Sequence, residues 1–242
     1  MSYASLSDPS ETQWNLLYKV GAAAGIAQLL IMMIQLVVFS IWPPPASAVG
    51  FFALFERNWL LGLLSLDLLY ILNNMLLIPI YLALYAALKR TNESAMLLAL
   101  VLGLVGIAAY FSSNIAFEML SLSAQFSAAD EATGNILLSS GQTLLEMYKG
   151  TAFDVYYVLN AAALLILAFV MRRSPVFSRA TAAWGLAAGI LMIIPSSAGM
   201  LGMIFALASL APWAVFLVLI TIRFTRLVKA DTHVTVGSAL TG

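Results

Sequence analysis

The sequence contains no cysteine and only one histidine among its 242 residues. Without cysteine, disulfide bonds, thiolate catalysis, iron–sulfur clusters and thiolate zinc sites are excluded. His233 lies near the C-terminus, so histidine ligation of haem within a membrane and histidine-dependent hydrolysis are not expected. The sequence therefore predicts no cofactor, and it leaves the nature of any metal site unknown.

Charged residues are also scarce. They make up 9% of the chain, and its 11 lysines and arginines balance its 11 aspartates and glutamates. A nucleic-acid partner is not expected, because phosphate binding requires a basic surface. The sequence also lacks a phosphate-binding glycine loop, a dinucleotide fingerprint and the usual hydrolase and metalloprotease motifs. Whether the protein is an enzyme stays open, with a non-enzymatic role favoured.

Apolar residues, in contrast, make up 62% of the chain, and the mean hydropathy is +0.98. Such a composition indicates an integral membrane protein. A bilayer core of about 30 Å needs about 20 apolar residues per helix. We therefore expect an all-α, polytopic membrane helix bundle with six transmembrane helices, at residues 17–42, 59–88, 94–122, 150–171, 181–208 and 210–228.

The distribution of cations predicts the orientation of these helices. With the N-terminus in the cytoplasm, nine of the 11 lysines and arginines lie inside, and only Arg57 and Lys149 lie outside, as the positive-inside rule favours. Three hairpins result, with both termini cytoplasmic. We also expect an amphipathic outer helix over 131–148, between helices 3 and 4. Residues 1–229 then form a single domain, followed by a disordered tail at 230–242.

Two sequence patterns recur along the chain. DLLYILNN at 67–74 and DVYYVLNA at 154–161 share the pattern D-x-x-Y-x-L-N, and both lie on spans that run from outside to inside. The intervening spans carry GAAAGI at 21–26, GLVGI at 103–107 and GLAAGI at 185–190. These matches suggest a threefold repeat of hairpins. The glycines alone are also explained by close packing between membrane helices.

An ionisable residue within a span indicates a functional site unless another role explains it. Asp67 and Asp154 are both predicted in the outer third of the membrane, where they could relay protons, seat a cation or amine, or bind a metal with oxygen ligands. Helix-dipole stabilisation alone would explain Asp154 in a first helical turn, but not Asp67, which is predicted two turns inside its helix. Hydrogen bonding between helices is the alternative for the tyrosines and asparagines. The remaining candidate ligand-binding or proton-relay residues are Tyr70, Tyr157, Asn73, Asn74, Asn160, Asn114 and Glu118, and Pro195 is a candidate kink or gate.

The segment FDVYYVLNAAALLILAFVMRRSPVFSRATAAWGLAAGIL, preceded by an outer segment containing LSAQF, resembles a family of bacterial six-span membrane proteins catalogued as domain of unknown function 4386. The likeness covers nearly the whole chain, including the polar insertion before the fourth span and the W-G-x-x-x-G pattern at Trp184, Gly185 and Gly189. The resemblance implies six spans and a bacterial inner (plasma) membrane. It supplies no catalytic residues to transfer.

These observations favour a protein that binds, and on one reading transports, a small molecule, cation or lipid in an outward-opening polar cavity marked by Asp67 and Asp154. The first alternative is a non-catalytic membrane accessory or assembly protein, whose polar residues lock helices together. The second is a lipid-modifying enzyme. Membrane lipids and a small-molecule or cation ligand are the expected partners, and the sequence does not predict an oligomeric state.

Overall fold

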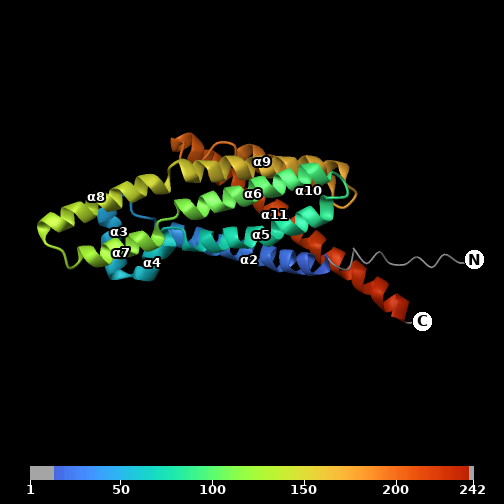
Figure 1. The fold of residues 1–242 in the computed structure, drawn as a ribbon, viewed down its shortest axis with the longest axis horizontal. Coiled ribbons are helices and arrows are strands. Elements are labelled where there is room, and N and C mark those ends of the chain that lie inside the picture. Colours follow the sequence, from blue (N-terminus) through green and yellow to red (C-terminus); the bar gives the residue numbers. More distant parts are fainter. Residues whose placement is uncertain (1–13, 240–242) are drawn as a thin grey trace, which may run out of the picture.

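The computed structural model describes the backbone of residues 14–239 and the side chains of residues 14–228 (Figure 1). Helices are the only regular elements in this described part of the chain, as the composition predicts. Their bounds are α2 (Asn15–Ile41), α3 (Ala48–Arg57), α4 (Trp59–Ser65), α5 (Leu68–Leu88), α6 (Glu93–Ser113), α7 (Ala116–Phe126), α8 (Glu131–Tyr148), α9 (Thr151–Arg173), α10 (Arg179–Leu191) and α11 (Gly199–Ala239).

Six of these helices form a closed ring. Each packs against two neighbours in the order α2, α5, α6, α9, α10, α11 and back to α2. The core between them is mainly apolar and includes the fully buried side chains of Leu84, Met96, Leu167, Phe216 and Phe224, although the polar side chains of Asn74 and Asn160 on the ring helices are also buried. The bundle is therefore stabilised by close contact between side chains of adjacent helices.

The repeated glycines lie where the ring helices approach most closely. Gly21, Gly103 and Gly185 are spaced 82 residues apart (103 − 21 and 185 − 103) on α2, α6 and α10, which alternate with the other ring helices. A Cβ atom on Gly103 would lie 2.7 Å from the Tyr81 ring of α5, and one on Gly185 would lie 3.0 Å from the Phe216 ring of α11. Close packing thus accounts for these glycines, and their alternating placement is what a threefold repeat of hairpins would produce.

The other four helices, α3, α4, α7 and α8, gather at one end of the bundle and form a small subdomain, which we call the head (Figure 1). The head has its own core, which includes Phe51, Phe52, Phe55, Met119 and Leu137. The predicted amphipathic helix is confirmed as α8. The Asp130 carboxylate accepts a 2.9 Å hydrogen bond from the Thr133 amide and begins this helix, in the usual manner of an N-cap aspartate.

The second and third predicted spans are not continuous helices. In place of one helix over 59–88, α4 ends at Ser65 and α5 begins at Leu68, and Asp67 between them has a left-handed backbone with φ of 63°. In place of one helix over 94–122, the helix is interrupted at residues 114–115, between α6 and α7. Asn114 stabilises both breaks: its amide donates to the Leu66 carbonyl at 2.9 Å, and its Oδ1 accepts from the Ala116 amide at 3.1 Å.

The last hairpin also differs from its predicted form. Helix α10 ends at Leu191, the chain turns over residues 192–198, and α11 then continues without a break through residue 209, where the fifth and sixth predicted spans were separated. Pro195 ends the helix because proline has no amide hydrogen to donate to the carbonyl one turn earlier. It therefore lies in a chain reversal and not in a kinked span. Residues 230–239, expected to be disordered, continue α11.

Five helical segments are long and apolar enough to cross a membrane: 15–41, 68–88, 93–126, 131–173 and 199–228. The predicted count of six is not confirmed, because α10 has only 13 residues and a length of about 20 Å. Opposite the head, α2 begins, α11 ends and the α5–α6 and α9–α10 connections lie together (Figure 1). We call this the basic end, because Lys89 and Arg90 lie in the α5–α6 connection and Arg172, Arg173 and Arg179 lie where α9 ends and α10 begins. Arg223 and Arg226 of α11 lie beside the α9–α10 connection.

Candidate functional site

The candidate site lies where the head meets the bundle, and Asp67 is at its centre. Asp67 occupies the N-cap position of α5, so the prediction that it lies two turns inside a helix is wrong. Its side chain is only 8% exposed and accepts a hydrogen bond from the Tyr148 hydroxyl of α8. It precedes the candidate span that starts at Leu68. Burial raises the pKa of Asp67 to about 6, although the hydrogen bond from Tyr148 opposes this shift.

Four tyrosines surround this carboxyl group. Electrostatic interactions connect it to the hydroxyl groups of Tyr70, Tyr110, Tyr148 and Tyr157, which come from α5, α6, α8 and α9. The Tyr110 side chain is only 2% exposed, yet its hydroxyl has no hydrogen-bond partner in the described part of the chain. Among the described residues, no lysine or arginine forms an ion pair with Asp67. We call these five residues the Asp67 cluster.

Asp154 lies in a different environment. It is half-buried in the first turn of α9 and accepts a hydrogen bond from the Ser197 hydroxyl in the α10–α11 turn. One helical turn later, Tyr157 hydrogen-bonds to Ser196 in that turn and also interacts electrostatically with Asp67. The two aspartates thus share no hydrogen-bond partner. Tyr157 connects them indirectly, because it interacts both with Asp67 and with the turn that contains the partner of Asp154. Both begin a helix, so the helix dipole favours a negative charge at Asp67 as well as at Asp154.

The asparagines of the repeated motif form matching local contacts. Asn74 donates to the Tyr70 carbonyl, and Asn160 donates to the Tyr156 carbonyl, each at 3.0 Å and four residues back along its helix. Both side chains are fully buried. Asn73, which the motif aligns with Asn160, is instead half-buried and offers its backbone carbonyl to a glutamine of α2. The structural counterpart of Asn160 is therefore Asn74, one residue later than the sequence match.

These two asparagines also connect α5 with α9. The Tyr81 hydroxyl of α5 donates to Asn160 Oδ1 at 2.8 Å, and the Asn74 side chain hydrogen-bonds to the Tyr156 hydroxyl of α9. A side chain at Gly106 would collide with the Asn160 amide. Each helix thus offers one asparagine and one tyrosine to the other. Asn160 therefore has the alternative role that the sequence allowed, because it forms a hydrogen bond between two helices.

Three further amides bond to backbone carbonyls. Gln28, Gln35 and Asn114 donate to carbonyl groups of α5, of α4 and of the junction between them, at 3.1, 3.4 and 2.9 Å. The side-chain oxygens of the two glutamines are buried and have no partner. Asn114 therefore has a structural role at the helix breaks, where it satisfies carbonyl groups that the interrupted helices leave free.

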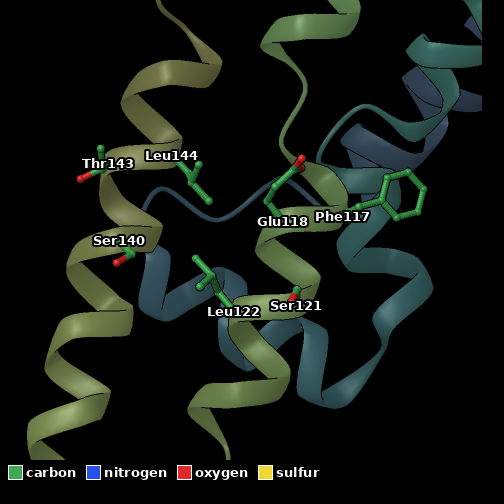
Figure 2. Close-up of a pocket in the computed structure, with 7 residues that line it drawn as sticks. All are labelled: Phe117, Glu118, Ser121, Leu122, Ser140, Thr143 and Leu144. Carbon is green, nitrogen blue, oxygen red and sulfur yellow. The ribbon is translucent and has the colours of Figure 1, made fainter.

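Glu118 lies apart from this cluster. It lines a groove of about 720 Å³ between α7 and α8 in the head (Figure 2). Leu122 and Leu144 project into the space between these two helices, whereas Phe117 points away from it (Figure 2). No residue of the Asp67 cluster lines this groove. Of the predicted site residues, the structure therefore places Glu118 in a groove separate from the Asp67 cluster.

The described residues contain no group of three histidine, cysteine, aspartate or glutamate side chains that could hold a metal ion. A metal at Asp67 would need amide and hydroxyl oxygens as its other ligands. Sequence reasoning missed Tyr148, the hydrogen-bond partner of Asp67. The one available signal was its position, two residues before Gly150 at the end of the amphipathic helix.

Comparison with known proteins supports the resemblance described above. The profile of a family described as domain of unknown function (DUF4386) matches residues 16–225. Searches of curated proteins and of solved structures found no match.

Proposed function

Since this chain belongs to the family described as domain of unknown function 4386, whose activity is open, we propose a function from the site itself: the protein binds a small organic cation at the Asp67 cluster. The observation that carries the proposal is the buried carboxyl group of Asp67, which has no cationic partner among residues 14–228, beside the buried hydroxyl of Tyr110, which has no hydrogen-bond partner there. A buried charge is costly unless an opposite charge accompanies it. A bound cation would supply that charge.

The tyrosines explain why an organic cation fits better than a small inorganic ion. Aromatic faces attract quaternary ammonium and protonated amine groups, with a contribution of about 0.5–2 kcal/mol for each well-placed ring. The aromatic surface extends beyond the Asp67 cluster, because the Phe153 ring lies 5.1 Å from that of Tyr157 and the Tyr156 ring lies 5.0 Å from that of Tyr110. A protonated amine could in addition donate hydrogen bonds to Asp67 and Tyr110.

The proposal includes an orientation in the membrane. The basic end faces the cytoplasm, in accordance with the positive-inside rule, and the head lies on the outer side. The short α10, together with the turn at 192–198, then makes the sixth crossing in a bacterial inner membrane. The ligand reaches Asp67 from the head side, and movement of α8, which carries Tyr148, opens the site.

A second function is favoured by a different observation. Gln28, Gln35 and Asn114 hold helix junctions together through carbonyl groups, as expected of an accessory or assembly protein without a small ligand. The two functions differ in what an isosteric replacement of Asp67 does. In an accessory protein it alters stability alone, whereas in a cation-binding protein it also abolishes the response to the cation.

Thermal unfolding in mild detergent tests the proposal. Tetramethylammonium chloride should raise the unfolding temperature of the wild type above that in sodium chloride at equal concentration. Asp67→Asn should abolish this difference, because the neutral amide offers no charge to the cation. The matched control Asp154→Asn should retain it. A wild type that responds equally to both salts would count against cation binding and favour the accessory role.

A further inference from the structure

A second candidate site lies at the basic end, far along the bundle from the head. It is a pocket of about 370 Å³ between the α9–α10 connection, the start of α10 and the last membrane-spanning turns of α11. None of the residues discussed so far as ligand-binding candidates belongs to it. Its lining consists of Pro175, Val176, Phe177, Ser178, Thr181, Leu219, Ile222, Arg223 and Arg226.

The polar part of this pocket is positively charged. Arg223 and Arg226 both belong to it, and its lining contains no acidic residue. The Nε atom of Arg223 is buried and has no hydrogen-bond partner among the side chains that the structure describes. A buried guanidinium donor without an acceptor is costly. The pocket therefore offers a donor that an anion could satisfy.

Hydroxyl groups and a helix terminus add to this preference for an anion. The Ser178 hydroxyl accepts a 3.1 Å hydrogen bond from the Thr181 amide and so begins α10. Ser178 and Thr181 both line the pocket, so the N-terminus of α10, which is the positive end of its dipole, borders it. Arginine, hydroxyl groups and a helix N-terminus are the usual partners of phosphate oxygens.

The rest of the pocket is apolar. Leu219 and Ile222 lie on α11, within the candidate span 199–228, and Ile222 is 43% exposed. Val176 and Phe177 complete this apolar part from the α9–α10 connection. A free phosphate ion would gain nothing from these side chains, whereas a molecule with an acyl chain would cover them.

We infer that this pocket binds an anionic membrane phospholipid, with its phosphate between Arg223 and Arg226 and an acyl chain along Leu219 and Ile222. The site is independent of the Asp67 cluster, and either proposal can fail without the other. A basic pocket at the end of a membrane bundle is suited to such headgroups. The bound lipid would hold α10 against α11, the hairpin whose first helix is short.

Native mass spectrometry of the detergent-solubilised protein, titrated with phosphatidylglycerol, measures this binding directly. Wild type should bind phosphatidylglycerol more tightly than zwitterionic phosphatidylcholine. Arg223→Gln together with Arg226→Gln should weaken phosphatidylglycerol binding about thirtyfold, since each arginine near the membrane surface contributes about fivefold. Arg226 is exposed, so Arg226→Gln alone leaves the fold intact and should weaken binding about fivefold.

The matched control is Arg172→Gln with Arg173→Gln, which removes the same charge from exposed positions of the same end outside the pocket. This pair should bind phosphatidylglycerol as the wild type does. Equal weakening by both double variants would show attraction to the basic surface in general, and would overturn the site. So would an unchanged affinity in Arg226→Gln. Inorganic phosphate that binds as tightly as phosphatidylglycerol would overturn the assignment to a lipid.

Discussion

The Tyr148 hydroxyl donates a hydrogen bond to the Asp67 carboxylate, and this contact joins the last residue of α8 in the head to the N-cap residue of α5 in the bundle. Asp67 is held in a left-handed conformation between two helices. Its carboxylate therefore lies where the helix is interrupted between α4 and α5. In the proposed function, this site opens when the head moves, while the ring of helices keeps its packing.

Replacement of Tyr148 by phenylalanine tests this contact. The variant leaves a buried carboxyl group without its donor and should lower the free energy of unfolding by about 1–3 kcal/mol. Urea unfolding in mixed micelles measures the change. Tyr85→Phe is the matched control, because the Tyr85 hydroxyl bonds to Glu93 at 3.2 Å in an exposed position. A loss in the control as large as that in Tyr148→Phe would contradict the account.

The raised pKa of Asp67 predicts how stability depends on pH. Burial raises the pKa of Asp67 in the folded protein to about 6, whereas an aspartate in its ordinary environment has a pKa of 3.8. The contribution of Asp67 to the free energy of unfolding should therefore be greatest below about pH 4. It should fall by about 3 kcal/mol as the pH rises through 6, because the folded protein must then bury a charged carboxylate.

Asp67→Asn should remove this contribution and should be more stable than the wild type at pH 7.5 in the absence of ligand. Unfolding curves between pH 4 and 8 for both proteins give the difference directly. Glu131→Gln, at an exposed position on α8, serves as the control and should follow the wild type. Parallel curves for wild type and Asp67→Asn would show that Asp67 does not titrate in this range.

Gly103 tests the close approach of α6 to α5. In Gly103→Ala, the new Cβ atom would lie 2.7 Å from the buried Tyr81 ring, and the helices must separate at a cost of about 1–3 kcal/mol. Gly134→Ala is the control, since its nearest contact is 3.3 Å from the half-buried Phe126 ring in the head. Equal thermal stability of Gly103→Ala and wild type would contradict the described packing.

Asn114→Ala should destabilise both helix breaks at once. It removes the donor to the Leu66 carbonyl and the acceptor of the Ala116 amide, at an expected cost of about 2–4 kcal/mol. Hydrogen exchange should quicken at residues 64–68 and 114–118 and leave the α9–α10 connection unchanged. Uniform exchange across the bundle would show that Asn114 does not hold these junctions.

Composition and periodicity predicted the helical bundle and the bounds of α8, but not where the long apolar runs break. Residues 66–67 and 114–115 interrupt helices inside such runs, because Asn114 supplies tertiary hydrogen bonds that no local pattern records. The positions of the prolines did not predict where the helices end. Pro79 and Pro212 lie inside α5 and α11, whereas Pro195 lies in a turn that leads to a glycine with φ of 64°.

The candidate site was predicted in part. Asp67, Tyr70 and Tyr157 were recognisable because scarce polar residues recur at equal offsets in two apolar runs. The groups that surround these residues could not be predicted from the sequence. Tyr148, for example, contacts Asp67 only because the head packs against the bundle. The motif also misaligned Asn73 with Asn160, because sequence offsets do not show which residues face the neighbouring helix.

Equilibrium binding of radiolabelled tetramethylammonium to the purified protein tests the central claim most directly. The account predicts saturable binding of one cation per chain at pH 7.5 and weaker binding at pH 5, where Asp67 takes up a proton. Binding should be absent in Asp67→Asn and preserved in Asp154→Asn. Saturable binding that persists unchanged in Asp67→Asn, or no saturable binding by the wild type, would contradict the proposal.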